Sequence, residues 1–416
     1  MPIGPRLRRT LRVAALLSVT ACAGPGTPER SGPGGDLLSS WLQGEPARFG
    51  EVLSNAEALR LKVELAVVVR GRDGVPTLER HSFDAGPQYF YPASSVKTCA
   101  AIAAALRLRQ IETAAGATLG LSTPLRFAPL FEGETLEELD ATHIDGGKIT
   151  LGHALRKVFL VSDNVAFNHL YEFAGNAYVN ATMRSAGLTS TRILHRLSEF
   201  HEPRDQLRTP SIELLQDGVV VAALPERSDG LTETNAGMTG ITAGEHYYGN
   251  GQFHDGPFSF LHKNYMSLRD LQDMHIMLLR PDIRIPGRPL GAGFALDPGD
   301  AEFMAAAMTE TPAESDDPVY DPAVYPDDYS KFLAPGAWKV LPRERLRIRD
   351  KVGRAYGFST TNSEVLDRST GRSYFLTATL YTNPNGVLND DDYDYAMADQ
   401  FFADLGEVVT AKLFAN

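Results

Sequence analysis

Strand-like segments stand near both ends of the chain and helix-like segments lie between them, an order that limits the folds open to it. Residues 61–70 are rich in Val and Leu, residues 77–83 alternate in polarity, and a Gly-Arg-Asp-Gly turn follows the first segment, which predicts a β-hairpin. Three more segments have strand-like patterns: residues 346–352, 357–366 and 374–381. Strands so far apart in sequence can share one antiparallel sheet if the helical part between them forms an inserted lobe.

Helical patterns account for much of the remaining chain. Thr150 can cap a helix, and residues 96–111 are rich in Ala and Leu and lack Gly and Pro. The predicted helices are residues 48–61, 96–111, 150–160, 164–173, 211–224, 267–279 and 396–414. Two stretches with many turn-forming or acidic residues, 224–261 and 309–328, are predicted to be loops. The predicted fold class is α/β plus all-α, with an antiparallel sheet flanked by N- and C-terminal helices and an inserted helical lobe.

The first residues predict an export signal followed by a lipid anchor. Four arginines precede a short apolar run, and Val19 to Cys22 resembles a bacterial lipobox, in which the signal is cut before a cysteine that becomes lipidated. We expect residues 1–21 to be a signal peptide and the Gly- and Pro-rich residues 22–36 to be a flexible linker anchored through Cys22. This predicts an exported cell-envelope lipoprotein, anchored in a membrane and facing the periplasm or the exterior.

The rest of the chain, residues 37–416, is expected to be one catalytic domain. Its α/β lobe would combine residues 45–92 with residues 340–416. Its helical lobe would comprise residues 93–339, including an enlarged loop at about 196–262. The hydrophobic content of 43% is ample for a packed core.

The charge, the cysteines and the histidines exclude some classes of function. The net charge is −12, and loss of the four leader arginines would make it −16, so nucleic acid is not an expected partner. Cys22 and Cys99 stand in different contexts, which argues against a disulfide framework and a structural zinc site. The histidines near the enlarged loop match no metal-ligand spacing and are expected to be solvated; they are His195, His201, His246, His254 and His262. We therefore predict neither a metal nor a cofactor.

The segment Pro92 to Lys97 carries the first candidate catalytic pair. Ser94 and Lys97 are three residues apart at a helix start, so one helical turn brings them to the same face. A serine hydroxyl is a poor nucleophile unless a neighbouring base takes its proton, and a lysine amine within reach can do so. A helix start also favours negative charge that develops beside the serine. Alone, this spacing is equally consistent with a capping serine and a solvated lysine.

Two further tripeptides complete a recognisable pattern. Ser162-Asp163-Asn164 follows a predicted helix, and Lys351-Val352-Gly353 lies in a predicted strand. With the Ser-x-x-Lys pair, their order and settings match the S-x-x-K, S-D-N and K-[ST]-G signature of penicillin-recognising serine enzymes. The chain therefore resembles class A β-lactamases and the wider β-lactamase/transpeptidase-like superfamily. Residues 150–168 and 348–362 are especially similar to the family pattern.

The resemblance implies a catalytic role for four residues. Ser94 would be the nucleophile and Lys97 its base or proton relay. Ser162 would pass a proton to the leaving nitrogen, and Lys351 would set the electrostatics around it. Acyl transfer needs a nucleophile and a proton shuttle of this kind.

The resemblance also implies how the substrate is held. Asn164 would bind its amide side chain, and Gly353 and Arg354 of the predicted strand would lie along it. The main-chain N–H groups of Ser94 and Arg354 would form the oxyanion hole, which stabilises the negative charge of the tetrahedral intermediate.

Two positions depart from the family pattern. Val352 stands where the family usually has a hydroxyl residue that helps to bind the substrate carboxylate, and valine cannot donate a hydrogen bond. In class A enzymes an Ω-loop carries a glutamate that activates the deacylating water. Here Glu199 follows Arg196 with one extra residue between them, and Glu202 is a second candidate.

These observations predict a serine hydrolase that is acylated on Ser94 and hydrolyses a β-lactam or a related amide. Two alternatives stay open at this point. One is an enzyme similar to D-alanyl-D-alanine carboxypeptidases that acts on peptidoglycan peptides with the same residues. The other is a non-catalytic envelope lipoprotein that keeps the fold. The expected partners are a small β-lactam or cell-wall peptide and, through the lipid anchor, a membrane.

Overall fold

The computed structural model describes residues 36–144, 146–230, 233–289, 291 and 293–415. The predicted signal peptide, Cys22 and the linker up to residue 35 lie outside the described residues, so the lipid anchor stays a prediction. The chain from Asp36 onward forms one unit. Among the helices described in this unit, none is both long and apolar enough to cross a bilayer.

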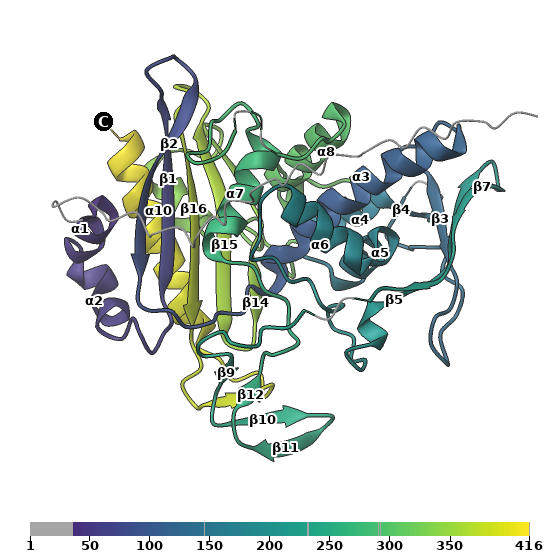
Figure 1. Cartoon of the computed structure of the whole chain (residues 1–416). Coiled ribbons are helices and arrows are strands. Elements are labelled where there is room, and N and C mark those ends of the chain that lie inside the picture. Colours follow the sequence, from purple (N-terminus) through teal and green to yellow (C-terminus); the bar gives the residue numbers. More distant parts are fainter. Residues whose placement is uncertain (1–35, 145, 231–232, 290, 292, 416) are drawn as a thin grey trace, which may run out of the picture. The chain divides into compact units, whose positions relative to one another are not determined.

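A central antiparallel sheet confirms the predicted fold class (Figure 1). Its strand order, β13–β15–β16–β1–β2, places strands from both ends of the chain side by side. These strands are β1 (Lys62–Arg70), β2 (Pro76–Asp84), β13 (Leu346–Asp350), β15 (Phe358–Asp367) and β16 (Ser373–Tyr381). A sixth strand, β14 (Gly353–Ala355), pairs with β15 in the same register as β13. β13 and β14 therefore form one edge of the sheet, interrupted only at Lys351 and Val352.

Helices cover both faces of this sheet. One face packs against helices from the two ends of the described chain (Figure 1), namely α1 (Leu37–Gln43), α2 (Pro46–Ser54), α9 (Ala334–Val340) and α10 (Tyr395–Phe414). α7 (Leu268–Leu279) lies on the opposite face, where Gln272 Nε2 donates to the Glu64 carbonyl of β1 at 2.8 Å. Each face of the sheet thus has its own hydrophobic core.

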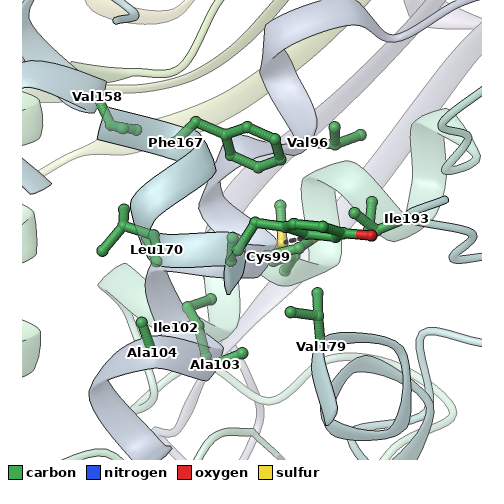
Figure 2. Close-up of a cluster of buried hydrophobic side chains, with 14 of the residues drawn as sticks. Val96, Cys99, Ile102, Ala103, Ala104, Val158, Phe167, Leu170, Val179 and Ile193 are labelled. Atoms are coloured by element: carbon green, nitrogen blue, oxygen red, sulfur yellow. Dashed lines mark hydrogen bonds between the residues drawn. The ribbon is translucent and has the colours of Figure 1, made fainter. Parts of the chain in front are cut away.

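The second core is organised around α3 (Lys97–Ala115). All of its residues from Lys97 to Ala105 are buried, because small alanine side chains let other helices approach closely. Figure 2 shows residues of α5 and α6 packed around Cys99 and Ile102 of α3. The other helices of this lobe are α4 (Leu151–Leu160), α5 (Asn164–Ala174), α6 (Asn176–Ser185) and α8 (Pro298–Thr309). This packing fixes the first turn of α3, which carries the predicted catalytic lysine.

The prediction of a helix over residues 211–224 is wrong. The segment forms β6 (Ile212–Gln216) and β7 (Val219–Leu224), which pair as a hairpin. Asp217 and Gly218 have φ values of +49° and +78°, the left-handed conformations that a tight hairpin turn requires. The two strands join β3 (Pro124–Phe127) and β4 (Ile149–Thr150) in a second sheet.

The prediction that residues 224–261 form only a loop is also wrong, because parts of this segment pair into short strands, some of which carry aromatic residues. They are β8 (Arg227–Ser228), β9 (Thr242–Ala243), β10 (His246–Gly249), β11 (Gln252–Asp255) and β12 (Phe258–Ser259). β8 pairs with β5 (Arg208–Thr209), and β10 pairs with β17 (Val387–Leu388). The predicted helix over residues 48–61 is shorter than expected and ends at Ser54. Sequence patterns also missed α1, α6, α8, α9 and β14.

Candidate active site

The structure brings the four predicted catalytic residues together where the helical lobe meets the sheet edge. Ser94 lies in a short 3₁₀ helix, η1 (Ala93–Val96), which leads directly into α3, and Lys97 is the first residue of α3. Ser162 lies between α4 and α5, where a φ of +61° turns the chain from one helix into the next. Lys351 lies in the interruption between β13 and β14.

The Ser162 hydroxyl lies between two buried lysines. Lys351 Nζ donates to Ser162 Oγ at 2.8 Å, and Lys97 Nζ is 3.4 Å from the same oxygen. Lys97 also donates to the carbonyl oxygens of Ser162 and Asp163 and, at 2.6 Å, to Asn164 Oδ1. The Ser94 hydroxyl is not among the acceptors of Lys97 described here. Lys97 must therefore exchange one of these contacts before it can take the proton of Ser94.

Burial sets the protonation of both lysines. Lys97 and Lys351 are 0% exposed, and this desolvation holds the pKa of Lys97 well below its usual value. The positive charge of Lys351 lowers the pKa of Lys97 further, while Asp163 opposes the shift. Burial also lowers the pKa of Lys351, to about 7, against the opposing charge of Asp350. A lowered pKa favours the neutral amine, which is the form of a lysine that can accept a proton.

The edge strand β14 closely approaches the backbone of η1, where the resemblance predicts an oxyanion hole. A Cβ atom on Gly353 would lie 2.4 Å from Pro92 O and 2.7 Å from Ser94 N, so only glycine fits. The Lys351 N–H bonds the Asn362 carbonyl of β15, and the register is unchanged through β14. Since antiparallel pairs alternate, the Arg354 N–H faces away from β15, toward the side where Ser94 lies. The two donors predicted from the sequence thus meet at one edge.

Ser94, Asn164 and Arg354 line an open cleft. One part of it has a volume of about 570 Å³ and the other about 470 Å³. Its walls are rich in aromatic residues that the sequence analysis did not identify: Tyr91, Tyr329, Tyr356, Tyr393 and Tyr395. Lys263 adds a positive charge, with Nζ 3.2 Å from the Tyr356 hydroxyl.

Two predicted binding residues occupy particular places in this cleft. Val352 lines the smaller part with Ser162 and is 5% exposed, so an apolar side chain stands where the family has a hydroxyl. The Arg354 guanidinium is paired with Asp399 and lies 4.7 Å from the Tyr395 ring centroid. Its side chain is therefore held at the wall, while its main chain faces the nucleophile.

The loop after α6 places Glu199 in the cleft but away from the lysines. Asn168 Nδ2 donates to Glu199 Oε1 at 2.7 Å, and both the N–H and the carbonyl of Leu197 bond the same asparagine side chain. Ser198, one of the two residues between Arg196 and Glu199, lies against Asn164, whose Nδ2 donates to its Oγ at 2.6 Å. Ser198 has a φ of +58°, so the insertion turns the chain and directs Glu199 toward α5. Glu199 is not among the acceptors of Lys97 described here.

The second candidate glutamate and a neighbouring histidine lie elsewhere. Glu202 lines an adjoining cavity of about 650 Å³, whereas the residues described around Ser94 do not include it. His195, expected to be solvated, is instead buried, and this burial lowers its pKa to about 3. His195 precedes Arg196, whose side chain is 0% exposed and paired with Glu172 at 2.7 Å. Both residues therefore belong to the buried base of the loop.

The described residues bring together a serine, a buried lysine and a hydroxyl within reach of two lysine amines, which are groups that a serine hydrolase can use. In the comparisons with known proteins, residues 83–216 match the model of the Beta-lactamase enzyme family. This segment contains Ser94, Lys97 and Ser162 and comprises roughly a third of the chain. No curated protein matches the chain.

Solved structures of β-lactamases are similar to this chain at low sequence identity. One from Xanthomonas campestris is 17% identical with a TM-score of 0.47, over 90% of this chain and 98% of that chain. The chromosome-encoded enzyme of Vibrio parahaemolyticus is 14% identical with a TM-score of 0.47, over 88% and 98%. One from Streptosporangium roseum is also 14% identical with a TM-score of 0.47, over 89% and 98%.

Proposed function

We propose that this protein hydrolyses a β-lactam or a related amide through an acyl-enzyme on Ser94. The observation that carries this proposal is the Ser162 hydroxyl, 2.8 Å from Lys351 Nζ and 3.4 Å from Lys97 Nζ. A hydroxyl between two amines of lowered pKa can move a proton from the nucleophile toward a leaving nitrogen. A capping serine with a solvated lysine would leave the lysine exposed, and Lys97 is 0% exposed.

In the proposed first step, Lys97 takes the proton of Ser94 as its oxygen attacks the carbonyl carbon of the amide. The N–H groups of Ser94 and Arg354 stabilise the oxyanion of the tetrahedral intermediate. When the C–N bond breaks, Ser162 delivers a proton to the leaving nitrogen and is reprotonated from the lysines. Hydrolysis of the ester by water then releases the acid and restores Ser94.

The substrate is expected to carry an anionic group. Lys263 brings positive charge to the cleft, which also contains Glu199 and Asp391, and Val352 cannot donate the hydrogen bond that the family hydroxyl supplies. Binding of a carboxylate in this cleft would therefore depend on charge more than on a hydroxyl contact, and should weaken as salt concentration increases.

A peptidase similar to D-alanyl-D-alanine carboxypeptidases is the second candidate. It is favoured by one feature, the placement of Ser198 rather than a glutamate beside Asn164. Such an enzyme would also be acylated by penicillin but would release the acyl group slowly. We further propose that the protein is exported and anchored through Cys22, which leaves the cleft free for envelope substrates.

The test is incubation of the purified protein with a penicillin and with a chromogenic cephalosporin, following protein mass and substrate loss together. Rapid turnover supports the lactamase, and a lasting adduct supports the peptidase. Peptide mapping should place the adduct on Ser94, and Ser94→Ala should abolish it. Ser95→Ala is the matched control, because the Ser95 hydroxyl donates a hydrogen bond to the Pro92 carbonyl at 2.7 Å. This variant should still be labelled on Ser94. The absence of both adduct and turnover would refute catalysis on this substrate class and favour the non-catalytic alternative.

A further inference from the structure

A second cluster of reactive side chains lies at the opposite end of α4 from Ser162. His143 precedes β4, His153 lies in the first turn of α4, and Asp317 lies in the loop after η3 (Pro312–Glu314). His143 Nε2 is 3.4 Å from Asp317 Oδ2, and His153 Nδ1 is 3.6 Å from Asp317 Oδ1. One potential ligand atom of each residue lies within 4.8 Å of the other two.

The hydrogen bonds around His143 fix which nitrogen carries its proton. His143 Nδ1 is 2.8 Å from the Lys148 carbonyl oxygen, which can only accept. Nδ1 is therefore the N–H donor of this ring, and a neutral ring keeps its lone pair on Nε2. That lone pair is on the nitrogen nearest Asp317.

The same reasoning applies to His153. Its Nε2 is 2.9 Å from Thr142 Oγ1, and that hydroxyl is 2.6 Å from Asp140 Oδ1. Because the threonine proton goes to the carboxylate, the hydroxyl oxygen accepts from His153 Nε2–H. Nδ1 then carries the lone pair, and it is buried with no hydrogen-bond partner among the described residues. The His153 side chain is only 2% exposed, so solvent does not readily replace that partner.

Two nitrogen lone pairs and a carboxylate thus face one another. Because these groups repel one another, a cation between them would stabilise the arrangement. Edges of a tetrahedral Zn²⁺ site with Zn–N bonds of 2.0–2.1 Å are roughly 3.3 Å long. The distances of 3.4 Å from His143 to Asp317 Oδ2 and 3.6 Å from His153 to Asp317 Oδ1 are close to that length, although they involve the two different oxygens of the carboxylate.

We propose that His143 Nε2, His153 Nδ1 and Asp317 bind one divalent transition-metal ion of the zinc type. Two imidazoles and a carboxylate suit Zn²⁺ better than Ca²⁺ or Mg²⁺, which prefer oxygen ligands. The hydrogen bonds to Lys148 O and Thr142 Oγ1 are the outer contacts that commonly orient metal-binding histidines. The two rings are stacked, 4.3 Å apart and 14° from parallel, so a shared ion requires them to tilt out of this stacked arrangement until their lone pairs converge.

Such an ion would be structural and would not depend on the function proposed above. It would link the loop before β4, the start of α4 and the loop after η3. Arg156 of α4 already ties the last of these loops, donating to the Asp317 carbonyl at 2.6 Å and to Glu310 Oε1 at 2.9 Å. This loop continues to Tyr329, which lines the cleft, and α4 ends just before Ser162. The ion would therefore brace two segments that lead into the active site.

The test is zinc binding by the purified, tag-free full-length protein. The protein is treated with a chelator, exposed to excess Zn²⁺ and dialysed, and its bound metal is measured by elemental mass spectrometry. We expect about one ion per chain in the wild type and almost none in Asp317→Asn and His153→Gln. His246→Gln is the matched control, because His246 Nδ1 also lies beside a carboxylate, Asp255 at 2.9 Å, but is not part of the cluster of potential ligands found among the described residues. It should keep the ion.

A second measurement covers variants that fold poorly. The melting temperature of chelator-treated wild type should rise by a few degrees with Zn²⁺ and not with Ca²⁺. The proposal is overturned if wild type holds no zinc, if its melting temperature ignores Zn²⁺, or if Asp317→Asn binds as well as wild type does. Those results would leave only a histidine–carboxylate ion pair. Labelling of Ser94 by penicillin, measured on the same samples, tests the proposed function separately.

Discussion

Gly353→Ala is expected to slow acylation of Ser94 sharply while leaving most of the fold in place. The new Cβ atom would lie 2.4 Å from Pro92 O, 2.7 Å from Ser94 N and 2.7 Å from Ser95 N. Ordinary carbon contacts are 3.4 Å or longer, so β14 and η1 must separate by roughly 1 Å. That movement spreads the Ser94 and Arg354 N–H groups, and loss of one oxyanion donor typically costs about 10²–10³-fold in rate.

The assay is the rate of appearance of the penicillin adduct by stopped-flow or quenched mass spectrometry, with melting temperature measured alongside. Gly50→Ala in α2 is the matched control, since the nearest atom to its new Cβ would be Pro46 Cβ at 3.9 Å. It should acylate at the wild-type rate. A Gly353→Ala protein that acylates as fast as wild type would refute the close approach of β14 to the nucleophile. A variant that melts far below wild type must be compared at a temperature where both proteins are folded.

Three further predictions concern deacylation, protonation and the anchor. Glu199→Gln should prolong the lifetime of the adduct and leave the acylation burst nearly unchanged, with Glu202→Gln as its control. If both variants deacylate at the wild-type rate, neither glutamate is the base that activates the deacylating water. Lys351→Met removes a charge that lowers the pKa of Lys97, so the acidic limb of the acylation pH profile should move to higher pH. Since the folded-state pKa of Lys351, about 7, is below the value of an exposed lysine, the unfolded chain binds the extra proton between those values. The free energy of unfolding measured in urea should therefore increase from pH 7 toward 10 in the wild type relative to Lys351→Met. If this free energy changes with pH in the same way in both proteins, burial does not lower the pKa of Lys351. Cys22→Ser should move the protein from the membrane to the soluble fraction, and retention in the membrane would disprove the lipid anchor.

Those parts of the structure that depend on local patterns could be predicted from the sequence. Thr150 caps α4 by accepting from His153 N at 3.1 Å, and Ser267 caps α7 in the same way, so both helix starts follow from residue type. The order of strands and helices predicted one sheet built from both ends of the chain. Ser94 and Lys97 lie on consecutive turns because their spacing is itself a helical distance.

Other parts depend on contacts between distant segments, and local patterns could not reveal them. Residues 211–224 have enough Leu, Val and Ala to suit either a helix or a strand, and only the Asp217-Gly218 turn signal distinguishes the two. His143, His153 and Asp317 come from three segments with no shared spacing, so a search for ligand motifs passes over them. The burial of His195 likewise depends on how the enlarged loop packs. The composition of this loop alone led to the expectation that His195 is solvated.

The single inserted residue in the loop has a larger consequence than its size suggests. Asn168 holds the Leu197 backbone at two points, which fixes the loop on α5 immediately before the insertion. The chain must then place one more side chain before the glutamate, and Ser198 takes the position against Asn164 while Glu199 turns to Asn168 and His201. In the proposed mechanism acylation does not use this loop, because the proposed nucleophile, base and oxyanion donors come from η1, α3 and β14. Deacylation in the family does use it, and a serine hydroxyl cannot hold negative charge near neutral pH as a carboxylate base does. The same fold can therefore keep the first half of the reaction intact while the insertion changes the second, which is why the lifetime of the Ser94 adduct discriminates between a lactamase and a peptidase.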